Sequence, residues 1–232
     1  MASKISRYVT PQGPEAEFQP GSYGRVLRNQ LGIRSKPEMD RVEYEALRHV
    51  QEEYFMKITP VTRFTAALIC QMHRDWLGEI YAWAGQYRSV ELQKDGFSWP
   101  PAFRVPENMS TFEVDRLARL TPCRPNPLPQ VAQQIAEVHA ELLFIHPFRE
   151  GNGRLARWVA DLMSLQAGFP VPKYVFSGPD EEKHHAKYLT AVKSGYLQNY
   201  DLLTEFFAEA ITRALAAAGR GVTGGKFRAP SK

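Results

Sequence analysis

Residues 146–157 place a histidine, an acid, a turn of small residues and two arginines within one short segment. His146 can serve as a general base near neutral pH. Gly151, Asn152 and Gly153 stand where a new helix should begin, and small residues there let backbone N–H groups approach an anion. The positive end of the helix dipole favours the same anion. The segment therefore predicts a polyphosphate site beside a base.

Charged side chains on both sides of this turn complete the predicted site. Glu150 precedes the first glycine, and an acid next to phosphates is a ligand for Mg²⁺. Arg154 and Arg157 stand three positions apart, so they share one face of the helix and can bind phosphate oxygens. We interpret Phe148 as an apolar anchor that fixes the loop.

A zinc site built from His139, His146 and Glu150 is an alternative for the same region. The spacing does not match His-Glu-x-x-His, in which two histidines one helical turn apart bind the metal. The histidine pair at positions 184–185 lies in a charged stretch and is interpreted as surface. We therefore expect a phosphate site here rather than a zinc site.

The segment at 146–157 resembles the signature of the Fic family, which reads His-Pro-Phe, any residue, an acid, Gly-Asn-Gly-Arg, two residues and Arg. Residues 80–88 resemble the Tyr-x-Trp-Ala-Gly-x-x-Arg stretch that precedes the hairpin flap of this family. Residues 27–33 are similar to the start of bacterial Fic toxins. Tyr188 and residues 199–203 are similar to the closing helices, so the likeness extends over most of the chain.

The resemblance implies a protein adenylyltransferase that uses ATP with Mg²⁺ and transfers AMP to a Ser, Thr or Tyr hydroxyl of a target protein. It assigns the removal of the hydroxyl proton to His146, the metal to Glu150 and the outer phosphate to Arg157. The implied phosphate cradle consists of Gly151, Asn152, Gly153 and Arg154. Chemistry of this kind depends on positioning and on charge stabilisation.

Related chemistries remain as alternatives. Doc-type toxins transfer the γ-phosphate and carry Lys where this chain has Gly153, and phosphocholine transferases carry Ala where it has Gly151. Both positions are glycine here, which favours AMP transfer. Removal of AMP from a target is another alternative, as is an inactive Fic fold that acts only as a binding module.

Many Fic proteins carry an internal inhibitory helix with Ser or Thr, three residues, Glu, and then Gly or Asn. The nearest candidates are Thr111 with Asp115 and Ser177 with Glu181. The first has Asp where the motif needs Glu, and in the second Glu181 is followed by Glu182 instead of Gly or Asn. Neither matches the motif. The chain therefore resembles the toxin class whose brake is a separate small antitoxin, and we expect the inhibitory Glu of that partner to pair with Arg157.

A hairpin is predicted across residues 86–99. Val90 and Leu92 alternate with polar residues before an Asp-Gly pair, and two aromatic residues follow it. By resemblance this hairpin is the flap that pairs with the backbone of the target as an added strand. The flap residues expected to position the target are Val90, Glu91, Leu92, Phe97 and Trp99.

Apolar residues at helical spacing predict that the rest of the chain is mostly helical. The stripe from Val131 to Ile145 predicts a helix that stops at the His146-Pro147 step, because a residue before proline leaves helical geometry. The expected fold class is all-α, a Fic-fold helical bundle with one β-hairpin flap. The predicted helices span residues 41–57, 62–82, 105–119, 131–145, 152–167, 180–195 and 201–218.

The ends and the composition of the chain bound its class. Residues 1–20 are expected to form a flexible arm, residues 21–218 the Fic domain, and residues 219–232 a disordered basic tail. The chain of 232 residues has a net charge of +4 and no recognisable nucleic-acid module. Two distant cysteines, no signal peptide and no long apolar run predict a cytoplasmic protein, or an effector injected into a host cell, without a membrane partner.

Overall fold

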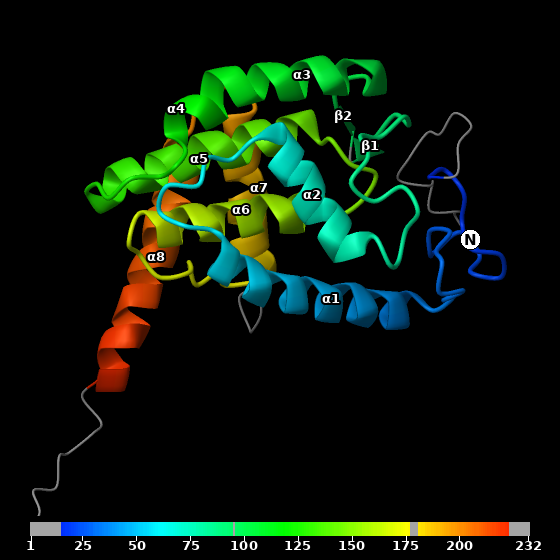
Figure 1. Cartoon of the computed structure of the whole chain (residues 1–232), viewed down its shortest axis with the longest axis horizontal. Helices are drawn as coiled ribbons and strands as arrows, with labels where there is room; N and C mark the ends of the chain where they lie inside the picture. Colours follow the sequence, from blue (N-terminus) through cyan, green and yellow to red (C-terminus); the bar gives the residue numbers. More distant parts are fainter. Residues whose placement is uncertain (1–14, 95, 177–180, 223–232) are drawn as a thin grey trace, which may run out of the picture.

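The structure, a computed structural model, describes residues 15–94, 96–176 and 181–222. Over these residues the chain forms a helical bundle with a two-stranded hairpin (Figure 1). The helices are α1 Lys36–Lys57, α2 Ala66–Leu77, α3 Val105–Phe112, α4 Ala118–Leu120, α5 Leu128–Ile145, α6 Asn152–Gln166, α7 Glu181–Gly195 and α8 Asp201–Val222. The strands are β1 Gln93–Lys94 and β2 Phe97–Ser98, and a 3₁₀ turn Ala102–Arg104 and a π-helical turn Glu113–Leu117 flank α3.

Helix α5 lies in the middle of the bundle and packs against α3, α6, α7 and α8. Figure 1 shows α5 and α6 between α1 on one side and α3 on the other. Buried residues, among them Val131, Ile135 and Leu142, cover more than half of the circumference of α5. A helix with so broad an apolar face is stable only when that face packs into a core. Its C-terminal end, where the predicted chemistry begins, is therefore firmly placed.

A tight loop joins the end of α5 to the start of α6. α5 ends at Ile145, as the proline at position 147 predicts. His146 adopts a left-handed conformation with φ of +52°, and its backbone N–H still donates to Leu142 O at 3.0 Å. α6 begins at Asn152, directly after Gly151. The expected order of helix end, loop and helix start is thus observed.

Several helices differ from their predicted spans; α1 begins at Lys36 rather than at residue 41, and α5 begins at Leu128 rather than at residue 131. α2 begins at Ala66 rather than at residue 62, because the Thr65 side chain caps it by accepting the Leu68 N–H at 3.0 Å. It also ends at Leu77, well before residue 82. The helix expected over residues 105–119 contains the π-helical turn and is therefore not one regular α-helix.

The hairpin is shorter than predicted. β1 and β2 pair over two residues each, and a bond from the Trp99 N–H to Leu92 O at 3.1 Å continues the pairing. Val90 and Leu92 are buried and precede the strand ladder. Their alternation with the exposed Glu91 reflects a chain that lays one side on the core. The prediction of paired strands across all of residues 86–99 was wrong for this reason.

Residues 15–20 differ from the expected flexible arm, because they are held on the body of the protein. Phe18 forms an isolated β-bridge with Leu27. Glu15 is buried, and its carboxylate accepts the Ser89 N–H at 2.5 Å. Such contacts join residues far apart in the sequence, so no local pattern announces them.

The remaining expectations for the chain ends fall partly outside the described residues. Residues 1–14 and 223–232 are among those that the structure does not describe. α8 continues to Val222, past residue 218, where the sequence predicts its end. Within the described part of the chain, no helix combines the length and the apolar character needed to cross a bilayer.

Candidate active site

The end of α5, the start of α6, α7 and the flap surround a pocket of about 290 Å³, here named the His146 pocket. His146, Glu150, Gly153 and Arg157 all line it, so these four predicted site residues meet in one place. The wall also contains two lysines and four aromatic residues, which are Lys94, Lys193, Phe97, Trp99, Tyr188 and Tyr196. A cationic pocket with aromatic walls suits a nucleotide polyphosphate.

His146 has a defined proton position. Its Nδ1 lies 3.0 Å from Leu143 O. Because a carbonyl oxygen only accepts, Nδ1 carries the proton and Nε2 is the basic nitrogen. Burial lowers the pKa of His146 below its usual value, although the bond to Leu143 opposes this. The Trp99 ring covers the imidazole with 4.1 Å between ring centroids. A neutral imidazole whose Nε2 carries no proton is the form that can accept a proton as a general base.

The loop after His146 is held by Phe148 and Asn152. Phe148 is fully buried and stacks on the His73 ring with 3.9 Å between centroids. The Asn152 side chain accepts the Phe148 N–H at 2.9 Å and donates to Phe148 O at 2.7 Å. The resemblance assigns Asn152 to the phosphate cradle. Its side chain is used inside the loop, so its backbone N–H is the group that remains for an anion.

His73 of α2 is a second support for the loop, and the sequence analysis missed it. Its Nδ1 accepts the Gly85 N–H at 2.8 Å, and its Nε2 donates to the backbone oxygen of Glu150 at 3.1 Å. Burial lowers the pKa of His73 to about 4, so the ring is neutral and both nitrogens are bonded. The only sign of this role in the sequence is that a histidine stands within the apolar stripe of residues 62–82.

The glycines at the start of α6 have different structural reasons. Gly151 has a φ of +83°, and a Cβ there would lie 2.8 Å from a ring carbon of the buried Trp76. At Gly153 a Cβ would meet nothing nearer than Arg157 Nη1 at 3.7 Å. No side chain caps α6. The backbone N–H groups of its first turn are therefore suited to bind an anion.

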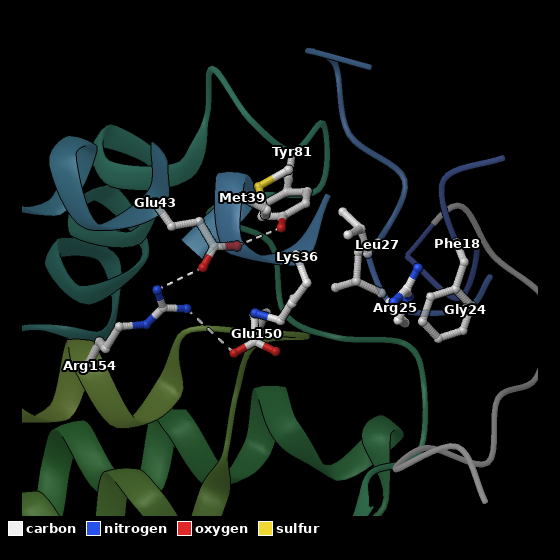
Figure 2. Close-up of a pocket in the computed structure, with 11 residues that line it drawn as sticks. Phe18, Gly24, Arg25, Leu27, Lys36, Met39, Glu43, Tyr81, Glu150 and Arg154 are labelled. Carbon is white, nitrogen blue, oxygen red and sulfur yellow. Dashed lines mark hydrogen bonds and ion pairs between the residues drawn. The ribbon is translucent and has the colours of Figure 1, made fainter. Parts of the chain in front are cut away.

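Arg154 points away from the His146 pocket. Its Nη1 pairs with Glu43 Oε2 at 2.7 Å, its Nη2 lies 3.6 Å from Glu150 Oε1, and its guanidinium stands 4.7 Å over the Trp76 ring. Figure 2 shows Arg154 between the two carboxylates, beside a second pocket of about 240 Å³. Arg154 was expected in the phosphate cradle, but in this structure it lies on the opposite side of Glu150.

Glu43 of α1 is a further residue that the sequence analysis did not single out. It is 3% exposed, and besides Arg154 it accepts the Tyr81 hydroxyl at 2.6 Å. Its backbone oxygen accepts the Trp76 Nε1–H at 2.8 Å. A buried carboxylate is stable only when its oxygens are paired in this way. An acid next to the apolar stripe of residues 41–57 was the only local sign of this role.

Arg157 faces the His146 pocket. Its guanidinium lies 5.3 Å over the Phe176 ring, and Tyr188 lines the same pocket. Burial raises the pKa of Tyr188, whereas the positive charge of Arg157 lowers it. None of the ion pairs in the described part of the chain involves Arg157. Its charge is therefore suited to a phosphate group in the pocket.

The metal predictions can be compared with the donors present. Glu150 is the one carboxylate among the described residues that line the His146 pocket. Mg²⁺ is commonly bound by one or two carboxylates together with phosphate oxygens and water, so this donor set fits Mg²⁺. The described residues contain no group of three His, Cys, Asp or Glu side chains placed to hold a metal. His139 is buried with Nε2 bonded to the Tyr188 hydroxyl at 2.8 Å, which argues against the zinc alternative.

Two of the expected flap residues line the pocket that contains His146. Phe97 and Trp99 line the His146 pocket, and Trp99 Nε1–H donates to Leu143 O at 3.0 Å. Glu91 instead accepts the Ala102 N–H at 3.1 Å and thereby braces the segment after the hairpin. The flap is therefore held against the end of α5, next to His146.

Comparison with known proteins identifies the family. The Fic/DOC family model matches residues 63–164. Probable protein adenylyltransferase y4lH of Sinorhizobium fredii is 32% identical over 155 residues, which cover 65% of this chain and 75% of that protein. Protein adenylyltransferase VbhT of Bartonella schoenbuchensis is 27% identical over 146 residues, 63% of this chain but 30% of that longer protein. The chain belongs to the Fic/DOC family.

The fold agrees with a solved structure. The crystal structure of the BepC protein of Bartonella tribocorum, a VirB-translocated effector with bound AMPPNP, matches with a TM-score of 0.66 at 18% identity. The match covers 84% of this chain and 96% of that chain. The predicted fold class, a helical bundle with one small hairpin, is confirmed.

Proposed function

We propose that this chain is a protein adenylyltransferase that transfers AMP from ATP, with Mg²⁺, to a Ser, Thr or Tyr hydroxyl of another protein. The observation that carries the proposal is the composition of the His146 pocket. A neutral histidine with Nε2 as base, the uncapped start of α6 and Arg157 meet there. Relatives named protein adenylyltransferase support the same activity.

In the proposed reaction the target hydroxyl oxygen attacks the α-phosphorus of ATP. The bond from that phosphorus to the oxygen bridging the α- and β-phosphates breaks, and pyrophosphate leaves. His146 Nε2 takes the hydroxyl proton. The first turn of α6 and Arg157 bind the β- and γ-phosphates and stabilise the charge of the leaving group. Glu150 would hold Mg²⁺, which neutralises phosphate charge when bound.

Gly153 supports AMP transfer over phosphoryl transfer. It lines the pocket without a side chain, and Arg157 Nη1 is the nearest atom to where a Cβ would stand. The phosphates can therefore lie directly on the start of α6. A lysine at this position, as in the Doc-type alternative, would extend a second cation into the phosphate site.

Labelled ATP tests the proposal. ATP labelled in the α-phosphate or in the γ-phosphate is incubated with the chain and a cell lysate, with His146→Ala as the control. We expect protein to acquire label from the α-phosphate only, and only with the unaltered chain. Label from the γ-phosphate would instead indicate the Doc-like phosphotransferase. Loss of label from a target already carrying AMP would indicate a de-AMPylase, and no transfer with intact ATP binding would indicate a binding module.

The proposed regulation is inhibition by a separate small antitoxin whose Glu pairs with Arg157. In support, no ion pair in the described residues occupies Arg157, and carboxylates and phosphates compete for the same guanidinium geometry. We expect the chain to be toxic when expressed alone and to be suppressed by a small neighbouring protein. Glu43 is the internal acid nearest to the signature arginines, so increased transfer by purified Glu43→Gly would reveal an internal brake and contradict this proposal.

A cytoplasmic location remains part of the same proposal, with delivery into a host cell as its alternative. The BepC structure is described as that of a VirB-translocated effector, which favours the alternative. Fractionation of cells expressing the chain, and of host cells in contact with them, distinguishes the two.

A further inference from the structure

Arg88 lies where the chain enters the flap, and it is bonded to the loop that carries the base. Its side chain is buried, with 2% of the residue exposed. Nε donates to His146 O at 2.7 Å, and the backbone N–H donates to Pro147 O at 2.8 Å. Two short bonds therefore attach Arg88 to the residues on which the position of the imidazole depends.

The other end of the same guanidinium holds the flap. Nη1 donates to Val90 O at 2.9 Å, and Nη2 donates to Pro100 O at 2.6 Å. Val90 precedes β1 and Pro100 follows β2, so these bonds join both ends of the hairpin segment. Only arginine presents donors in a rigid planar fork that reaches several carbonyl oxygens at once.

A second connection joins the same two parts from a distant segment. The Ser89 N–H and hydroxyl both donate to the carboxylate of Glu15. The backbone oxygen of Glu15 accepts Arg149 Nε at 2.8 Å. Ser89 belongs to the start of the flap and Arg149 to the loop after the base. The N-terminal segment thus links flap and loop independently of Arg88.

We propose that Arg88 is a positioning residue that holds the flap in register with His146, and that Glu15 reinforces this junction. The proposal rests on the proposed function in one respect, namely that the flap carries the hydroxyl to be modified. Transfer needs that hydroxyl within hydrogen-bond reach of Nε2, and a misplacement of about 1 Å costs up to about 100-fold in rate. Binding of ATP is less sensitive to such a shift, because the flap supplies only one wall of the His146 pocket and the phosphates are assigned to the start of α6 and Arg157.

Arg88→Lys tests the proposal because lysine keeps the charge but cannot reach the carbonyl oxygens of His146, Val90 and Pro100 together. The matched control is Arg104→Lys, since Arg104 lies just beyond the flap, is 53% exposed in its side chain and pairs with Glu107. We expect Arg88→Lys to lower the maximal rate of AMP transfer roughly 10- to 100-fold. The KM for ATP and the affinity for AMPPNP should stay within about twofold, and the control should match the unaltered chain.

Amide hydrogen exchange provides a measurement that does not depend on transfer. In Arg88→Lys, exchange should become faster in residues 89–94 and 96–99 but not in α5 or α6. Glu15→Gln should produce a smaller change of the same kind, and it decides the matter if Arg88→Lys does not fold. The proposal would be overturned if Arg88→Lys changed neither the amide exchange of the flap nor the maximal rate. It would also be overturned if the affinity for AMPPNP fell in parallel with the rate. An unaltered chain that transfers no AMP would refute the proposed function, while the exchange data would still decide the role of Arg88.

Discussion

Replacing Gly151 with alanine should destabilise the protein, whereas the same change at Gly153 should not. Gly151 has a φ of +83°, and its added Cβ would stand 2.8 Å from the Trp76 ring. The ring has little freedom to move, because its Nε1–H is bonded to Glu43 O at 2.8 Å and Arg154 lies 4.7 Å above it. Backbone strain and steric overlap therefore act together at this position.

The expected magnitude follows from these two terms. A non-glycine residue in the left-handed region costs about 1–2 kcal/mol. Forcing an extra methyl group into a packed core costs about 1–3 kcal/mol. Their sum for Gly151→Ala is about 2–5 kcal/mol, and about 2–4 °C in Tm is expected for each kcal/mol in a chain of this size.

Gly153→Ala is the matched control. It lies in the first turn of α6, has no positive φ, and its Cβ would meet nothing closer than 3.7 Å. Alanine in a helix is favoured over glycine by up to about 1 kcal/mol, so this variant should be slightly more stable than the unaltered chain. Urea denaturation and thermal unfolding of the three proteins measure the difference directly. Equal midpoints for the two variants would refute the reasoning that Trp76 and the backbone require glycine at position 151.

Three further predictions concern His146 and Glu43. His146→Ala should abolish AMP transfer but leave AMPPNP affinity within about twofold, because the proton is removed only during the reaction. Labelling measures the transfer and calorimetry measures the affinity. Transfer near the level of the unaltered chain would exclude His146 as the base. The folded pKa of His146 is lowered, so its contribution to stability is present above the unfolded pKa and is lost as pH falls. Between pH 6.5 and 5 the free energy of unfolding of the unaltered chain should therefore fall by about 1–2 kcal/mol more than that of His146→Ala. Urea denaturation at each pH measures this difference, and equal falls in the two proteins would contradict the burial of the ring. Glu43→Gln should cost about 1.5–3 kcal/mol, because Arg154 loses a charged partner, and an unfolding free energy unchanged within error would show that this ion pair contributes nothing.

Much of the architecture could be predicted from the sequence, because helices are specified by short-range rules. The stripe along α5 and the proline at position 147 predict where that helix ends, and the glycine-rich turn predicts where α6 begins. The flap shows the limit of the same reasoning. Alternation at Val90 and Leu92 suggested paired strands, but burial of one side of an irregular chain produces the same pattern.

The supports of the candidate site could not be predicted in this way. Glu43 pairs with Arg154, His73 bonds to the backbone of Glu150, and Glu15 bonds to Ser89, each across a long sequence separation. Single polar residues of this kind belong neither to a hydrophobic periodicity nor to a motif with a recognisable spacing. Two of them stand beside stripes that the sequence correctly predicts as helical, where a polar residue alone does not reveal its partner.

The sequence by itself determined the candidate site segment at 146–157 and the helix boundaries around it, because these follow from neighbouring residues. The tertiary structure alone decided that Arg157 faces the His146 pocket while Arg154 turns to Glu43. Residues three positions apart share a broad helix face, so the sequence assigns both arginines to phosphate. Which of them meets a buried acid depends on how α1 packs against the start of α6, and that packing is the sum of contacts between distant parts of the chain.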